Sequence, residues 1–185
     1  MHSAVQAIES LPLPSDPLLG PGLFALTDIM SDPYPGHSVI PSCCSVTSDR
    51  RLLERETMES VLGEIQQLPV LDGVNATIAD GEYTTYTGAT LRGPKFFPAW
   101  KLEADHPFVQ FALAGLRAAG LDPRLGAYRF CTNAAYSARV ANVPTVGFGP
   151  SPESYAHMVD EYIELTHLYA AARGYLGIIE TPLSA

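Results

Sequence analysis

Apolar residues recur at helical spacing in one segment of the first half of the chain. Between Glu56 and Leu68 they form a single stripe made of Met58, Val61, Leu62, Ile65 and Leu68. A stripe with this period predicts an amphipathic helix over 56–68. A weaker stripe predicts a helix over 2–11, which the prolines at 12 and 14 would end.

Strand-like patterns surround these two helices. Strands are predicted over 23–30 and over 39–53, the second with a break near Pro41. Apolar and polar residues then alternate from Val74 to Glu82, which predicts a half-buried strand. The order helix, strand, strand, helix, strand over residues 1–82 predicts an incomplete ferredoxin-like α+β domain that lacks its first strand.

Residues 83–99 show no period, and Gly88, Gly93, Pro94 and Pro98 predict an extended linker between two domains. Residues 100–185 return to a regular pattern. A helix capped by Asp105, with Pro107 in its first turn, should run to Gly120.

Further along, the pattern predicts a strand over 125–130, a helix over 133–141 and a strand over 144–148. A last helix capped by Asp160 should bury the stripe Leu165, Leu168, Ala172 and Leu176. Alternating helices and strands indicate part of an α/β sheet, so the chain as a whole belongs to the α/β class.

Composition excludes several functions. The chain has 185 residues, with 20 acidic against 11 basic residues and no basic run, which argues against nucleic acid as a partner. Apolar stretches are too short to span a membrane. Three cysteines without a paired pattern, and an N-terminus without secretory features, favour a cytoplasmic protein. The low charged fraction of 17% and the apolar fraction of 46% predict apolar surface that meets a partner or a missing piece of chain.

The most informative local segment is the apolar strand from Val143, which ends in the Gly/Pro loop Gly147–Pro150 and is followed by His157. Loops at strand ends commonly carry ligands in α/β sheets. An imidazole there could bind zinc. A loop histidine without a function is the alternative, and the more frequent one from local sequence alone.

Four groups of motifs resemble segments of one known family, and they occur along this chain in the same order as in that family. The segments His37–Pro41 and Asp49–Leu52, followed by Glu56–Thr57, resemble the lid domain of the acetylornithine deacetylase and succinyl-diaminopimelate desuccinylase metallopeptidases, an aminoacylase-type zinc family. Four later segments resemble the end of that family's catalytic domain: Thr132–Asn133, Val143–Pro150, Ala156–His157 and Asp160–Tyr162. The segments Phe97–Trp100 and Asp105–Pro107 resemble a branch linked to selenium metabolism.

The resemblance implies hydrolysis of amide or peptide bonds in small N-acyl amino acids, dipeptides or related amides. The family uses a two-metal site, usually zinc, with cobalt or manganese as other metals, and it dimerises through the lid. By position, His157 matches the last metal ligand. The resemblance also implies that 1–82 is a partial lid and 100–185 the C-terminal piece of a zinc-peptidase-like catalytic sheet with helices.

The other family ligands and the general base have no match here, because the chain contains no His-x-Asp, no Glu-Glu and no HExxH. We therefore expect a C-terminal portion of an enzyme that is inactive alone and carries no catalytic residue. Three residues are candidates for substrate binding: His37, Ser38 and Asn133. Ser38 stands where the family commonly has Asn, and Asn133 where it commonly has Asp, so both put the transferred substrate specificity in doubt.

Other interpretations stay open. The chain could be a non-catalytic dimerisation or interaction module derived from the family. It could also use a different one-metal site, which would need Asp105, His106 or Glu153 near His157. His37 follows a Pro-Gly turn and would more often face solvent. Of the neighbouring Arg50 and Arg51, one should pair with a carboxylate as a structural contact.

Overall fold

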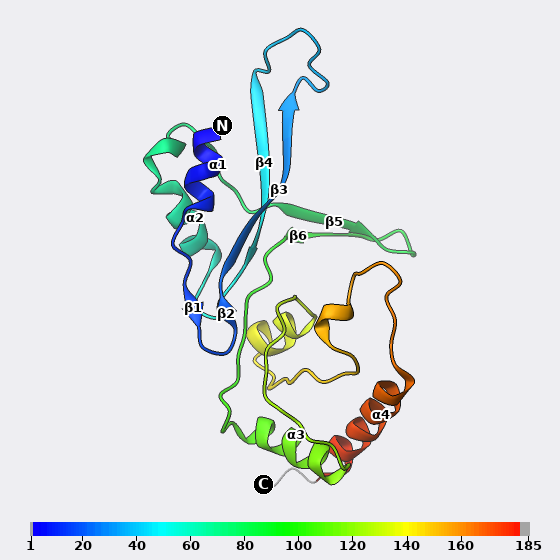
Figure 1. The fold of residues 1–185 in the computed structure, drawn as a ribbon. Coiled ribbons are helices and arrows are strands. Elements are labelled where there is room, and N and C mark those ends of the chain that lie inside the picture. The colour runs from blue at the N-terminus through cyan, green and yellow to red at the C-terminus, as the bar shows by residue number, and fades with distance from the viewer. Residues whose placement is uncertain (1, 182–185) are drawn as a thin grey trace. The chain divides into compact units, whose positions relative to one another are not determined.

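The computed structural model describes residues 2–181, and the chain divides into two compact units, Met1–Ala99 and Trp100–Ala185 (Figure 1). Each unit is described by itself. Helices and small antiparallel sheets occur together, which confirms the α/β fold class. Within residues 2–181, no helix is both long enough and apolar enough to cross a membrane.

A long antiparallel hairpin is the main element of the first unit. Strand β3 (Leu23–Asp32) pairs with β4 (Cys43–Arg51), and a bulge at Thr27 shifts the register. The short strands β1 (Ser15–Asp16) and β2 (Gly20–Pro21) pair beside it. The strand predicted over 39–53 thus begins only at Cys43, because residues 33–42 form the tip of the hairpin.

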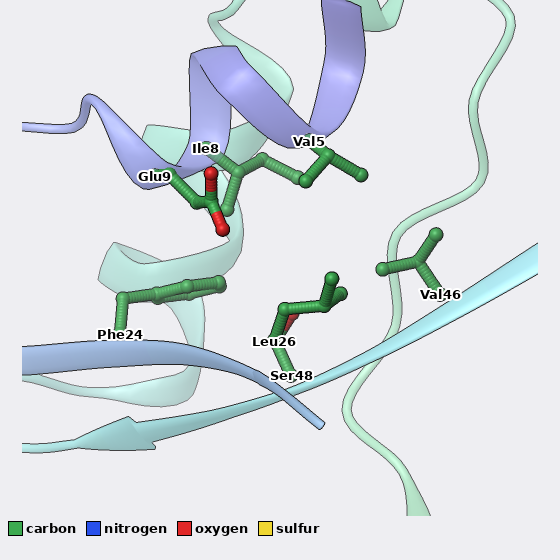
Figure 2. Close-up of a pocket in the computed structure, with 7 residues that line it drawn as sticks. All are labelled: Val5, Ile8, Glu9, Phe24, Leu26, Val46 and Ser48. Carbon is green, nitrogen blue, oxygen red and sulfur yellow. The ribbon is translucent and has the colours of Figure 1, made fainter. Parts of the chain in front are cut away.

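Helix α1 (His2–Glu9) lies against β3. Figure 2 shows Val5 and Ile8 of α1 above Phe24 and Leu26 of β3. These side chains line a hollow whose volume is about 10 Å³. A space of that size holds at most one water molecule. The hollow is therefore a packing feature of a small core and too small to be a ligand site.

Helix α2 (Met58–Gln66) confirms the helix predicted over 56–68, with slightly shorter bounds. Thr57 caps it: the Thr57 hydroxyl accepts from the N–H of Ser60, and the Ser60 hydroxyl accepts from the N–H of Thr57. This reciprocal pair satisfies donors that the first turn leaves free. Val61 is the buried residue of the helix, and the turn η1 (Pro69–Leu71) follows it.

The segment expected to be an extended linker contains a second hairpin. Strand β5 (Asp80–Thr84) pairs with β6 (Thr90–Pro94), whereas 74–79 is not in a strand. Gly88 has a φ of 84°, and its N–H donates to the carbonyl of Thr85 at 2.9 Å, which closes the turn. The sequence pattern did not predict the hairpin, because both strands are largely exposed and neither has an apolar face.

Two helices in close contact organise the second unit. Helix α3 (Pro107–Ala118) packs against α4 (Leu165–Glu180) through glycines. A Cβ on Gly115 would lie 2.6 Å from the Cα of Ile178, and one on Gly177 would lie 2.3 Å from the carbonyl oxygen of Gly115. The two backbones approach so closely that only glycine fits at either position.

The predicted start of α3 is corrected by one residue. His106, and not Asp105, is the N-cap, and its Nδ1 accepts from the N–H of Phe108 at 3.1 Å. Pro107 holds the first helical position and Gly120, with a φ of 77°, follows the helix end, as predicted.

The segment between α3 and α4 differs most from the prediction. The stretches 125–130 and 144–148 have no regular secondary structure, with a bend at 129–130, and pair with no strand in the described part of the chain. The helix expected over 133–141 is the π-helical turn η2 (Ala135–Val140), and η3 (Glu153–Tyr155) is a single 3₁₀ turn. A strand needs a neighbouring strand for its ladder of hydrogen bonds, and residues 2–181 supply no such strand to either stretch, whose backbone instead bonds the side chains of Glu153 and Tyr175.

Helix α4 begins at Leu165 rather than after Asp160, whose φ of 59° is left-handed and ends any helical run. The apolar stripe predicted to be buried is exposed: Leu165, Leu168 and Leu176 are 64%, 44% and 57% accessible. Packing on α3 instead uses Ala171 and Gly174, because small residues permit the short distance between the helices.

Candidate functional site

His157 lies exposed in the loop between η3 and α4. Its φ of 62° places it in the left-handed region, which a non-glycine residue adopts only when its surroundings hold it there. Here its backbone N–H donates to Glu161 Oε2 at 2.8 Å. The carboxylate thus fixes the main chain of His157 while the imidazole remains accessible to a ligand.

Aromatic rings close the same loop. The Tyr155 and Tyr162 rings lie with centroids 4.9 Å apart, tilted by 32°. A hydrogen bond and the charge of Tyr155 raise the pKa of Tyr162. The two rings bracket His157 in sequence and bring the ends of the 155–162 turn together.

Hydrogen bonds hold the stretches 125–130 and 144–148 near the base of this loop. Glu153 Oε1 accepts from the backbone N–H of Arg129 at 3.0 Å, and the Tyr175 hydroxyl donates to the carbonyl of Phe148 at 2.5 Å. Burial, with Tyr175 and Glu153 nearby, raises the pKa of Tyr128. These contacts anchor the segments around residues 128 and 148, although neither is part of a sheet.

The predicted substrate-binding residues fall in different units. Asn133 is exposed at the start of η2, where its carbonyl accepts from the N–H groups of Tyr136 and Ser137. His37 and Ser38 are exposed at the tip of the β3–β4 hairpin, in the first unit. The structure places Asn133 in the same unit as His157, but it does not join the four residues into one site.

The side chains present do not fit a catalytic zinc site. Such a site takes about three protein ligands. Across residues 2–181, no three His, Cys, Asp or Glu side chains come close enough to hold one metal ion. Glu153 is engaged by Arg129, and His106 caps α3, so the one-metal alternative gains no support from them.

The structure contains two further features, a hollow and a buried ion cluster, that the sequence did not predict as sites. One is a hollow of about 380 Å³ between α3, α4 and the loop 148–152, called here the Phe148 hollow. Ser151 Oγ and His167 Nδ1 belong to residues that line it, and both are buried without a hydrogen-bond partner in the described structure. No motif at Ser151 or His167 indicated this, because the hollow arises from helix packing.

The other feature is a buried ion cluster in the first unit. Arg50 on β4 contacts Glu56 and, at 2.7 Å, Glu64 of α2. The side chains of Arg50 and Glu56 are 6% and 8% accessible, and Glu56 Oε2 also accepts from the N–H of Leu53. The expectation that one of the two neighbouring arginines has a structural carboxylate partner is confirmed.

Comparison with known proteins decides the family. Residues 16–181 match the model of peptidase family M20/M25/M40. The chain belongs to this family. Its members are metal-dependent hydrolases, and membership confirms the resemblance to zinc metallopeptidases that the motifs indicated.

Two curated relatives carry the same printed name, "Uncharacterized protein YgeY", from Escherichia coli strain K12 and from Escherichia coli O157:H7. Each is 33% identical over 174 residues. The match covers 91% of this chain but 42% of each relative. The M20 chain described here thus spans less than half the length of the curated relatives it matches.

Proposed function

We propose that this chain forms the C-terminal portion of a metal-dependent hydrolase that cleaves amide or peptide bonds in small N-acyl amino acids, dipeptides or related amides. The observation that carries the proposal is His157, held by Glu161 in a left-handed loop with its imidazole exposed, in a chain of the M20 family. In the intact enzyme a metal pair, zinc by family precedent and otherwise cobalt or manganese, would activate water.

The contribution of this chain would be one imidazole ligand, presented by a main chain that is already fixed. The other ligands and the general base would come from the part of the fold that the relatives have and this chain does not cover. His37, Ser38 and Asn133 would contact substrate once the parts of the enzyme are assembled. By itself the chain would be inactive, and we place the enzyme in the cytoplasm.

The first unit would serve as the lid and as a homodimer contact. Both strands of the β3–β4 hairpin have a free edge in the described structure. Free edges readily pair with another strand, and an isolated two-stranded hairpin is only marginally stable. A second copy pairing along this edge would give the symmetric dimer.

A chimera tests the hydrolase proposal: the present chain replaces the 42% of YgeY that it matches. We expect about two zinc ions per chimera by plasma mass spectrometry and hydrolysis of a panel of N-acyl amino acids and dipeptides. His157→Ala should lose about one metal ion and most activity. The control His106→Asn removes an imidazole but keeps a helix cap, so it should retain both.

The outcome for the isolated chain is equally informative. Near-stoichiometric zinc on the chain alone, lost in His157→Ala, would contradict the proposal because it would reveal a complete site within these residues. A metal-free chimera without hydrolysis would favour the second candidate, a non-catalytic interaction module. The interaction module is supported by Ser38 and Asn133, which stand where the family commonly has Asn and Asp.

A further inference from the structure

Ser137 belongs to a closed ring of hydrogen bonds in the second unit. Its carbonyl accepts from the backbone N–H of Val143 at 2.8 Å, and its hydroxyl lies 3.0 Å from the hydroxyl of Thr145. The Thr145 hydroxyl donates to the carbonyl of Val143, also at 2.8 Å. Ser137 and Val143 are therefore joined twice, once through the main chain and once through the two hydroxyl groups.

The number of hydrogens sets the direction of these bonds. A hydroxyl carries one hydrogen, and that of Thr145 is engaged by the Val143 carbonyl. The Ser137 hydroxyl therefore donates to Thr145 Oγ1, since its other acceptor, the carbonyl of Ala134, is more distant at 3.4 Å. Hydrogen bonds in such a chain strengthen one another, and the half-buried positions of both hydroxyl-bearing residues limit competition from water.

The ring holds the π-helical turn η2 and, through it, the main chain of Asn133. The N–H of Ser137 donates to the Asn133 carbonyl at 3.3 Å, and the N–H of Tyr136 donates to the same carbonyl at 3.0 Å. Ala135 is buried beneath the turn, so η2 is fixed by packing as well as by hydrogen bonds. Turns of this type are rare and occur frequently at functional sites.

The side chain of Asn133 is exposed and makes no hydrogen bond with another residue in the described part of the chain. Its amide can both donate and accept, which matches the amide and carboxylate groups of the substrates proposed above. A contact from a main chain that is already fixed costs less ordering when the substrate binds. The position of Asn133 therefore matters for substrate affinity.

We propose that Ser137 is a positioning residue for substrate binding. Through Thr145 and Val143 it fixes the main chain from which Asn133 presents its amide, without touching the substrate itself. The inference rests on the proposed function for the substrate contact of Asn133, and it adds the residues that hold this contact in place.

Steady-state kinetics of the YgeY chimera test the inference, on the N-acyl amino acid or dipeptide of the panel that it hydrolyses fastest. Ser137→Ala removes the hydroxyl and introduces a residue that favours helical backbone, so the fold should persist. It should raise KM by about three- to tenfold, the range of one lost hydrogen bond, and leave kcat within about twofold. A residue needed only for folding would instead reduce the active fraction, and hence kcat, at an unchanged KM.

Thr145 offers a matched pair of variants. Thr145→Val keeps the shape but removes the hydroxyl, so it should raise KM as Ser137→Ala does, whereas Thr145→Ser keeps the hydroxyl and should retain the parent KM. Combining Ser137→Ala with Thr145→Val should raise KM no further than either change alone, because both break the same ring. Ser154→Ala, at an exposed serine of η3, is the control and should change neither constant.

The isolated chain supplies a readout that needs no activity. In heteronuclear NMR spectra, Ser137→Ala should shift the side-chain amide signals of Asn133 and accelerate exchange of the Tyr136 amide by about three- to tenfold, whereas Ser154→Ala should do neither.

The two proposals fail separately. An unchanged KM in the Ser137→Ala chimera, or a fall in kcat alone, would overturn the inference and leave the hydrolase function standing. A chimera that hydrolyses no amide would remove the hydrolase function, and the NMR spectra would still decide whether Ser137 positions Asn133. Unchanged Asn133 signals would overturn the inference in that case as well.

Discussion

The two units are stabilised by different kinds of contact. The first unit pairs the strands of the β3–β4 hairpin, and Arg50 of β4 contacts Glu56 just before α2 and Glu64 within it. The second unit packs α3 on α4 through Gly115, Gly174 and Gly177 and leaves the stretches 125–130 and 144–148 unpaired within residues 2–181. The difference teaches that strand pairing and a buried ion contact can hold one half of a chain while close helix packing holds the other.

The largest effect should come from breaking the ion contact of the first unit. Glu56→Ala leaves the buried Arg50 with only the half-exposed Glu64 as a partner and removes the acceptor of the Leu53 N–H, which should lower the free energy of unfolding by about 3 kcal/mol. Glu64→Ala, which removes the more exposed partner, should lower it by less than about 1 kcal/mol. Urea unfolding followed by circular dichroism measures both, and equal effects would show that burial does not set the strength of this cluster.

Crowding the helix contact should weaken the second unit next. Gly115→Ala forces a methyl group against the backbone of Ile178 and should cost about 2 kcal/mol. Gly63→Ala in α2 meets nothing within 4 Å and should instead stabilise its helix by up to about 1 kcal/mol. The same urea titration distinguishes them. Changes of opposite sign in the free energy of unfolding would support the contrast between the units. A Gly115→Ala variant as stable as the parent chain would contradict it.

A hydrogen bond joins the stretch 144–148 to α4. Tyr175→Phe removes the donor to the Phe148 carbonyl and should destabilise the second unit by about 1 kcal/mol. Tyr169→Phe, on a ring that is 67% exposed, should change the unfolding free energy by no more than a few tenths of a kcal/mol. If thermal unfolding gives the two variants the same melting temperature, the Tyr175 hydrogen bond does not stabilise the stretch 144–148.

The smallest effect should appear in alkaline solution. Burial raises the pKa of Tyr128 above its usual value near 10, so the unfolded chain ionises first as the pH rises. Stability from this group is complete below about pH 10 and is lost as the pH rises above it. Tyr128→Phe should flatten the decline in urea midpoints between pH 9 and 11, and an unchanged decline would show that this ring does not contribute.

Local signals explain what the sequence could predict. Helix α2 was predictable because its apolar stripe and its Thr57 cap lie within a dozen residues. The stretches 125–130 and 144–148 have strand-like sequences, yet pairing depends on residues elsewhere, so pattern alone overstated them. The stripe on α4 failed for a related reason: the pattern identifies an apolar face but does not say whether that face meets this chain or another.

The candidate site divides in the same way. Motifs led to His157 and its exposed loop, but its left-handed main chain depends on Glu161 four residues later, which periodicity does not reveal. Ser151 and His167 could not be found from sequence, since they share the Phe148 hollow only through helix packing.

The bulge at Thr27 has a consequence for insertions and deletions in this lineage. The extra residue reverses which alternate side chains of β3 face α1 and adds local twist before the hairpin reaches its tip. Deleting Thr27 would keep every strand residue paired yet rotate the distal half, with His37 and Ser38, relative to the proximal half. A one-codon change could therefore re-aim the tip of the β3–β4 hairpin without replacing any residue on it.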